Sequence, residues 1–218
     1  DVYNTRSELI PYAHIIILKE LSLAGDFVKT GSTNDVAFES QRLTTGELVF
    51  RKCEGPLNTR RFYIARDKPE KLYTYGSTPA GVDGAILTNG SMRLRVDEKT
   101  GAIASLIWKN KDNDVELVDT NSATGLNDFL YLPGGDLKGL QRNGPVKITV
   151  KERGPIIASL LIESDAPGCR KLTREIRMHA CKDYVEIINT VDKAPVRAKE
   201  GIHFGFGFNV PDGVMRMN

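Results

Sequence analysis

Residues 87–119 of this chain read LTNGSMRLRVDEKTGAIASLIWKNKDNDVELVD, and this stretch decides the fold class. Met92, Leu94 and Val96 alternate with polar residues, as in a strand that buries one face. A second strand-like run, residues 103–108, follows the turn sequence DEKTG, in which Gly101 can take the positive φ that a tight turn requires. The pattern predicts an antiparallel hairpin that ends at the polar sequence KDND.

The same pattern recurs along the rest of the chain. Residues 146–151 and 156–163 flank a Gly-Pro turn, and residues 172–178 and 184–191 form another pair of strand candidates. Apolar residues at helical spacing are nearly absent, and Gly and Pro interrupt the sequence often. The sequence therefore predicts an all-β protein built from antiparallel hairpins.

Strand length and turn composition divide the chain into two units. Short strand candidates at intervals of roughly ten residues predict a small β-sandwich over residues 1–68. Residues 69–84 are rich in Gly, Pro and polar residues and are expected to form a connection. The longer hairpins of residues 85–218 predict part of a large antiparallel sandwich. Because residues 214–218 begin a strand without a partner, we expect an exposed sheet edge there, which favours an edge-strand dimer.

Composition limits the classes of partner. The 218 residues include 30 Lys and Arg and 28 Asp and Glu, so the net charge of +2 gives no field that would recruit nucleic acid or an anionic membrane. Apolar runs such as residues 15–18 are too short to cross a bilayer. We therefore expect a soluble protein without a nucleic-acid or membrane partner, in a compartment that the sequence does not indicate.

The cysteines do not form a recognisable framework. Cys53, Cys169 and Cys181 are too few and too irregularly spaced for a disulfide scaffold or a zinc ribbon. An odd number leaves at least one thiol unpaired. Free thiols are the preferred interpretation, with a Cys169–Cys181 bridge across a hairpin as the alternative.

Three parts of the chain resemble the β-sandwich region of retaining α-mannosidases of glycoside hydrolase family 38. They are PYAHIIILKE at residues 11–20 with ESQRLTTGELVF at 39–50, DEKTGAIASL at 97–106 with ELVD at 116–119, and EGIHFGFGFNVPDG at 200–213. Their order and spacing fit nearly the whole chain. The resemblance implies that residues 85–218 are the N-terminal part of a mutarotase-like supersandwich.

The resemblance also implies where the chemistry of such an enzyme lies. In that family an upstream α/β domain supplies a zinc ion, its His and Asp ligands, and an Asp nucleophile. This sequence has no His-x-Asp or His-x-His cluster in which to place such ligands. We therefore expect no catalytic residue and no cofactor in this chain, with zinc in the missing catalytic domain. The isolated chain is expected to be inactive, and its partners would be that α/β domain and α-mannoside glycans.

One matching segment lies close to where a substrate would bind. The sequence DFLYLPGG at residues 128–135 resembles the place where the family positions a tyrosine at the edge of the active site. The corresponding residue here is Phe129, which lacks the hydroxyl, and Tyr131 follows on the same strand face. An aromatic ring can stack on a sugar without a hydroxyl. Phe129 and Tyr131 are therefore the substrate-proximal candidates, and we expect the Phe129 ring to be exposed where the catalytic domain would cover it.

Two other classes of function fit parts of the pattern. A free-standing carbohydrate-binding module would use Trp108, Phe129 and Tyr131 for stacking on sugars, although packing is the preferred role of Trp108. A mutarotase-like epimerase would use His203 as a catalytic base opposite a carboxylate. No carboxylate partner can be assigned to His203, and a structural role is preferred.

Two polar motifs have structural interpretations that outweigh functional ones. Asp112, Asp114 and Glu116 lack the glycine and the terminal glutamate of a calcium loop, so a solvated turn is preferred. The sequence Asn89-Gly90-Ser91 matches the glycosylation pattern, but a turn before a strand explains it adequately.

The remaining aromatic and histidine residues are assigned to the framework. Phe204, Phe206 and Phe208 alternate with glycines and are predicted to line the core face of a sheet. His14 and His179 are assigned to strand or edge positions.

Overall fold

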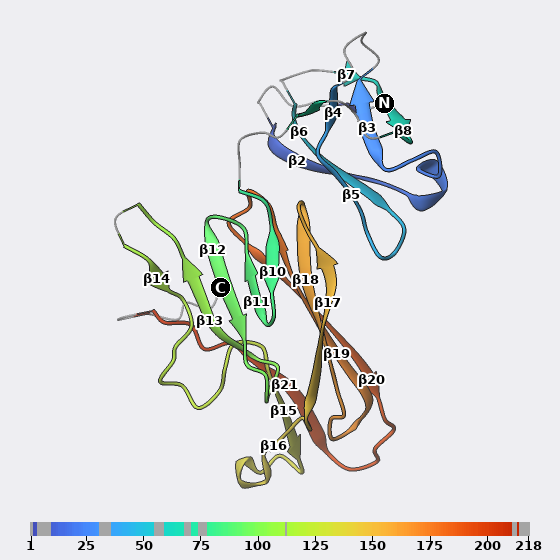
Figure 1. Ribbon diagram of the computed structural model, residues 1–218. Coiled ribbons are helices and arrows are strands. Elements are labelled where there is room, and N and C mark those ends of the chain that lie inside the picture. Colours follow the sequence, from blue (N-terminus) through green and yellow to red (C-terminus); the bar gives the residue numbers. More distant parts are fainter. Residues whose placement is uncertain are drawn as a thin grey trace.

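The computed structural model of the chain is all-β, as predicted. It describes residues 2–3, 10–30, 36–54, 59–67, 71–73, 78–111, 113–210 and 213. Within these residues the helical segments are two short 3₁₀ turns, Lys19–Leu21 and Leu137–Gly139. Figure 1 shows two units, a small one that contains β1–β9 and a larger one that contains β10–β21.

The small unit consists of two facing sheets and a short two-stranded pair. One sheet has the order β2-β6-β5 and the other has the order β8-β3-β4-β9. The bounds are β1 Val2–Tyr3, β2 Ile10–Ile17, β3 Phe27–Thr30, β4 Val36–Phe38, β5 Ser40–Arg42, β6 Leu48–Glu54, β7 Thr59–Arg60, β8 Phe62–Ala65 and β9 Lys71–Tyr73. Val28, Phe38, Leu48 and Phe50 form a buried core with contributions from both sheets.

The larger unit consists of three antiparallel sheets. Their orders are β10-β11-β12-β13-β14, β16-β15-β21 and β17-β18-β19-β20. The bounds are β10 Gly81–Asp83, β11 Ile86–Thr88, β12 Met92–Val96, β13 Ile103–Trp108, β14 Val115–Glu116, β15 Asp128–Pro133, β16 Gln141–Arg142, β17 Val146–Arg153, β18 Ile157–Ser164, β19 Cys169–His179, β20 Val185–Lys193 and β21 Glu200–Gly205. The β17–β20 sheet shares one apolar core with the five-stranded sheet and a second one with the three-stranded sheet.

The hairpin that the sequence predicted at residues 92–108 is present. Leu94 lies opposite Leu106 in the β12–β13 ladder, and both are buried. The turn has Gly101 at φ +71°, and the Asp97 carboxylate accepts hydrogen bonds from the backbone N–H groups of Lys99 and Thr100 at 2.9 and 2.8 Å. The pairs β17–β18 and β19–β20 likewise match the predicted hairpins.

The connection between the units is shorter than expected. β9 and β10 both fall within residues 69–84, yet β9 pairs with β4 of the small unit and β10 pairs with β11 of the larger unit. Within that range the structure therefore assigns Lys71–Tyr73 to the small unit and Gly81–Asp83 to the larger unit. The predicted edge at residues 214–218 lies outside the described residues. In the described part of the chain, no helix is long and apolar enough to span a membrane.

Candidate functional site: a cleft between the two units

The turn that joins β5 to β6 points from the small unit toward the larger one (Figure 1). Leu43 N donates to Glu47 O at 2.9 Å, and Gly46 takes φ +98°, which favours glycine. The Arg42 guanidinium fixes the turn. It donates to the carbonyl oxygen of Gly46 in the turn at 2.7 Å, and to those of Ser22 and Gly25 in the neighbouring segment at 2.8 and 2.6 Å. The small unit thus presents a fixed polar turn.

Hydrogen bonds from this hairpin join the two units. Gln41 is buried, and its Oε1 accepts from the backbone N–H groups of Ile156 and Ile157 at 2.9 and 2.8 Å. Its Nε2 donates to Ile157 O at 2.9 Å. The backbone N–H and the hydroxyl of Thr44 donate to Glu152 Oε1 at 2.8 and 2.6 Å. Every polar atom of the Gln41 amide that faces the larger unit therefore has a specific partner there.

A cleft with a volume of about 350 Å³ lies beside these contacts, between the turn and the β17–β20 sheet. Its lining residues are Ile16, Leu43, Thr45 and Glu47 of the small unit, and Lys151, Glu152, Ile157, Arg177, His179 and Glu186 of the larger unit. Cross-strand register explains the floor of the cleft. Glu152, Ser159, Arg177 and Glu186 are successive partners across the four strands, so their side chains share one face of the sheet.

The cationic side chains of the floor are neutralised by a buried carboxylate. Glu175 accepts from Lys151 Nζ and Arg177 Nε, each at 2.7 Å. Burial alone would raise the pKa of Glu175, but the hydrogen bonds from Arg177 and Lys151 outweigh it and lower that pKa. Glu175 therefore stays ionised, and neither cation offers a free charge to a ligand.

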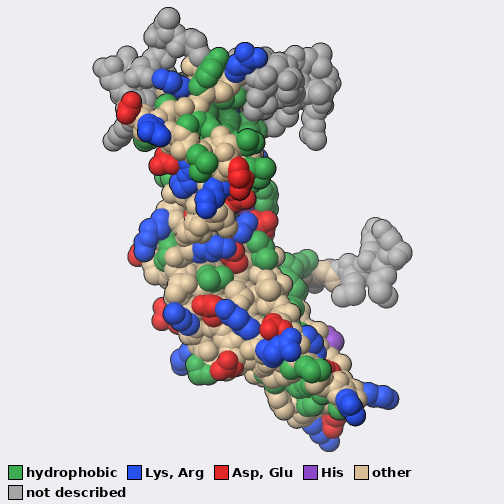
Figure 2. Space-filling view, turned by 90° about the vertical axis from the view of Figure 1, so that its right-hand side faces the viewer, with side chains coloured by type: hydrophobic (Ala, Val, Ile, Leu, Met, Phe, Trp, Pro, Cys, Tyr) green, Lys and Arg blue, Asp and Glu red, His purple; other side chains and the backbone are tan. Residues whose placement is uncertain are grey.

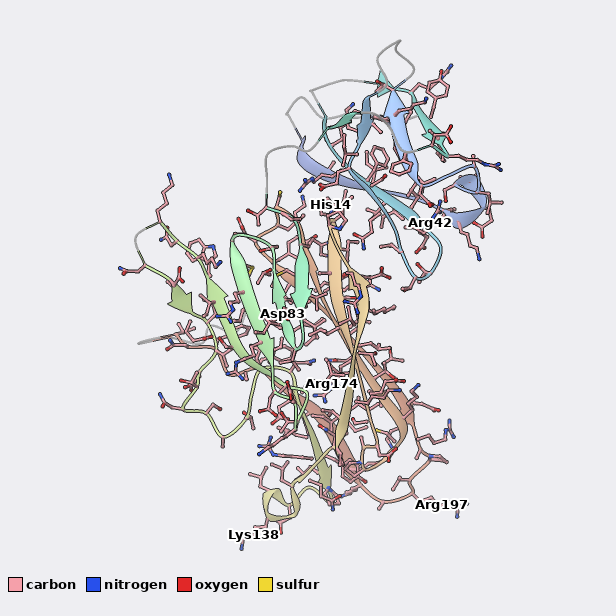
Figure 3. The ribbon with its side chains drawn as sticks, in the orientation of Figure 1. His14, Arg42, Asp83, Lys138, Arg174 and Arg197 are labelled. Atoms are coloured by element: carbon pink, nitrogen blue, oxygen red, sulfur yellow. The ribbon has the colours of Figure 1, made fainter. Side chains whose placement is uncertain are left out.

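Two histidines lie where the units meet, and Figure 3 labels one of them, His14. The rings of His14 and His179 stack with centroids 5.6 Å apart and planes 29° apart. Burial, followed by the proximity of His179, lowers the pKa of His14 to about 4. Burial also lowers the pKa of His179, although Glu186 Oε2, 3.3 Å from His179 Nε2, opposes the shift. Both rings are therefore neutral at pH 7.

The predicted substrate-proximal residues, Phe129 and Tyr131, are buried. Phe129 is 0% exposed and Tyr131 is 8% exposed, so the expectation of an exposed Phe129 ring is wrong. Phe129 packs edge-on against Phe204 with ring centroids 5.8 Å apart, within the core shared by β15, β21 and the β17–β20 sheet. The Tyr131 hydroxyl donates to Glu200 Oε2 at 2.7 Å. The two residues do share one strand face, but that face is packed against the four-stranded sheet.

Two of the three phenylalanines that were expected to line the core, Phe206 and Phe208, are exposed, whereas Phe204 packs against the core beside Phe129. Phe206 and Phe208 are each 52% exposed and stack with ring centroids 6.4 Å apart, whereas Phe204 is half-buried. The prediction fails because β21 ends at Gly205, and the following residues run beside residues 117–119 at the margin of the sheet. Trp108, at the end of β13, is 41% exposed.

The other candidates remain separate from one another. The His203 side chain is exposed, and no carboxylate partner of it occurs among the described residues. Within the described chain no group of three or more His, Cys, Asp and Glu could hold a metal ion. Glu116 instead accepts hydrogen bonds from Ser105 Oγ and from the N–H groups of Leu106 and Val118. Asp112 lies outside the described residues.

Two cysteines are free thiols, and Asn89 has a structural role. Cys169 and Cys181 are free thiols, so they form no bridge, and the Cys53 side chain lies outside the described residues. Asn89 is 2% exposed, and its amide donates to the carbonyl oxygens of His179 and Lys182 at 2.8 and 2.7 Å. A buried amide with two acceptors is not available for glycosylation in the folded protein.

Sequence reasoning missed the residues that build the cleft. Gln41 and Ile157 are 116 positions apart, and no local pattern links them. The sequence predicted strands at residues 172–178 and 184–191, but it did not indicate that a turn of the small unit lies over one face of their sheet. Comparison with protein-family models and with curated proteins gives no match to this chain.

Proposed function

We propose that this chain is the non-catalytic β-sandwich portion of a glycoside hydrolase that acts on α-mannosides. The observation that supports this best is the order of the two units, a small sandwich followed by a larger antiparallel one, joined by the buried Gln41 contacts. This order agrees with the resemblance to the β region of family 38. The role of the chain would be to support an upstream α/β catalytic domain, which would supply the zinc ion and the Asp nucleophile.

Charge and burial are consistent with a supporting role. Figure 2 shows Lys and Arg side chains interspersed with Asp and Glu side chains over the surface in view, without a patch of a single sign. Phe129 and Tyr131 are enclosed in the core, so they would act by holding β15 in place rather than by contacting the sugar. Under this proposal, the segment that resembles an active-site edge would have a structural role in this chain.

The coding sequence upstream of Asp1 tests this proposal. We expect it to encode an α/β domain with a His-x-Asp zinc-ligand arrangement and a catalytic Asp. An upstream sequence without these elements would overturn the assignment to an α-mannosidase. That result would not affect the description of the contacts between the two units, because both units belong to this chain.

A further inference from the structure

We propose that the junction between the two units is a pH-sensitive switch, which opens without unfolding either unit when His14 becomes protonated. His14 lies on β2 of the small unit and His179 on β19 of the larger unit, and their rings stack with centroids 5.6 Å apart. A charge on one ring therefore acts directly across the junction. The inference concerns the conformation of this chain and does not depend on the enzyme function proposed above.

The buried nitrogens of the histidine pair favour neutral rings. His14 Nε2 and His179 Nδ1 are buried and have no hydrogen-bond partner among the described residues. In a neutral imidazole one nitrogen carries no proton, whereas an imidazolium has an N–H donor on both nitrogens. Protonation in the closed junction would therefore bury a positive charge and an unpaired donor, and separation of the units would expose both to water.

The charges that face His14 from its own unit oppose its protonation. Arg51 on β6 is the cross-strand neighbour of His14, and its side chain is fully buried. Glu39 accepts from Arg51 Nη2, so its negative charge is already engaged. Arg51 Nη1 donates to Cys181 Sγ of the larger unit at 3.1 Å, which keeps this cation at the junction. A second cation on His14 would therefore be repelled from within the small unit.

The larger unit faces His14 with a cation and with a second ring that can be protonated. Lys182, just beyond β19, lies close enough to oppose a charge on His14. Glu186 Oε2 on β20 lies 3.3 Å from His179 Nε2 and 3.5 Å from Arg177 Nη1. Glu186 therefore favours a proton on His179, and a charged His179 would repel a charged His14 further.

The remaining contacts of the junction are compatible with opening. In the described chain, the apolar cluster of the junction contains three buried residues, Val49, Ile156 and Ile157, whereas the core of the larger unit contains fifteen. The polar contacts include the hydrogen bonds of Gln41 and Thr44 described above. Interfaces between units permit relative motion unless they are large and hydrophobic. Opening at this junction would leave the cores of both units intact.

The switch should act between about pH 6.5 and pH 4. The pKa of His14 is lowered from 6.5 to about 4 in the closed junction, by burial and then by the proximity of His179. Opening would return this pKa toward 6.5, so the open form binds more protons in this window. The ratio of closed to open molecules is therefore highest above pH 6.5, and it falls by at most about 300-fold as the pH decreases through 4.

Hydrogen exchange of two backbone amides measures the opening. The N–H groups of Ile156 and Ile157 donate to Gln41 Oε1 across the junction, so they exchange when the units separate. Phe50 in the small unit and Leu160 in the larger unit lie on central strands, and their amides report the unfolding of each unit. After correction for intrinsic exchange rates, Ile156 and Ile157 should be less protected than both. Their protection should fall about 50-fold between pH 7 and pH 4.5.

Substitutions at His14 identify the group that senses pH. His14→Gln and His14→Phe both remove the titrating group, and the phenylalanine keeps an aromatic ring against His179; each variant should lose most of the fall in protection. His203→Gln, at an exposed position of β21, is the matched control and should retain the full fall. Glu152→Gln removes a carboxylate at the junction but keeps an acceptor for Thr44, and it should also retain the fall.

Three results would overturn the proposal. Equal protection of the two junction amides and of Phe50 and Leu160 would show that the units separate only by unfolding. A fall in protection that persists in both His14 variants would assign the pH dependence to another group. A fall that Glu152→Gln abolishes would assign it to that carboxylate.

Discussion

At the scale of single residues, the histidine pair makes the junction between the units sensitive to pH. His14 belongs to β2 and His179 to β19, and both rings are largely buried. Lys182 and Arg51 lie close enough to lower the pKa of His14 further, and protonation would place a second positive charge beside them. The folded protein therefore favours neutral imidazoles at this junction.

The stability of the protein should fall as the pH decreases from 6.5 toward 4. The pKa of His14 is about 4 when folded and 6.5 when unfolded, so the unfolded chain binds more protons in this window. Stability is therefore complete above pH 6.5, and His14 accounts for a loss of about 2 kcal/mol near pH 4 after allowance for its partial exposure. Urea denaturation at several pH values measures this loss. His14→Gln should reduce the pH dependence of the free energy of unfolding, whereas His203→Gln, at an exposed position, should not. The same pH dependence in the unmodified protein and both variants would refute the role of His14.

Phe129→Tyr should destabilise the protein rather than restore a sugar contact. The Phe129 ring is fully buried, so the added hydroxyl would also be buried, at a position where the native residue needs no hydrogen-bond partner. We expect a loss of about 1–3 kcal/mol in the free energy of unfolding. Phe206→Tyr, at a ring that is 52% exposed, is the matched control and should be neutral. A Phe129→Tyr variant as stable as the parent protein would contradict this prediction, because it would mean that the core around β15 accommodates the hydroxyl.

At the scale of elements, β19 shows what alternation predicts and what it leaves out. Ile176 and Met178 alternate with Glu175 and Arg177 along this strand, and both apolar residues are fully buried. The same face also carries Arg174, which is 0% exposed and for which alternation alone would predict an apolar residue. Figure 3 shows Arg174 inside the larger unit. Its guanidinium donates to Asn127 O at 3.2 Å and to Thr100 O at 2.6 Å, and burial lowers its pKa to about 10.

Arg174→Met should weaken the larger unit. Asn127 O would lose its donor, and Thr100 O, in a separate turn, would keep only the hydrogen bond from Asn143 Nδ2 at 3.2 Å. We expect a loss of about 2–4 kcal/mol in the free energy of unfolding, since buried carbonyl groups without partners are costly. Arg170→Met on the same strand removes a surface ion pair with Asp192 and should change stability by less than about 1 kcal/mol. Similar effects of the two substitutions in thermal denaturation would contradict the structural role of Arg174.

At the scale of the whole molecule, the sequence predicted two β units but not how they meet. Strand spacing and turn composition are local properties, so they indicated the fold class and the hairpins. The contacts of Gln41 with Ile156 and Ile157 join segments more than 100 positions apart, so their pairing appears only in three dimensions. For the same reason the sequence predicted a core position for Phe206 and Phe208, whose rings are each 52% exposed in the structure.

Gln41→Leu should uncouple the two units. The substitution removes the acceptor of the N–H groups of Ile156 and Ile157 in a buried interface, and leaves Ile157 O with the backbone N–H of Gly154 as its donor. We expect a cost of about 2–4 kcal/mol, and calorimetry should show separate unfolding transitions for the two units. Gln141→Leu, at an exposed position in β16, should leave the unfolding profile unchanged. Retention of a single transition in Gln41→Leu would show that other contacts govern the coupling.

The hydrolysis of an aryl α-mannoside by two proteins tests the central claim most directly. One protein is the product of the complete reading frame that contains these 218 residues, and the other is the 218-residue chain alone, each assayed with and without added zinc. The proposal predicts zinc-dependent hydrolysis by the complete product and none by the isolated chain. Hydrolysis by the isolated chain, or an inactive complete product that retains bound zinc, would contradict the claim that this chain is the non-catalytic β-sandwich portion of an α-mannosidase.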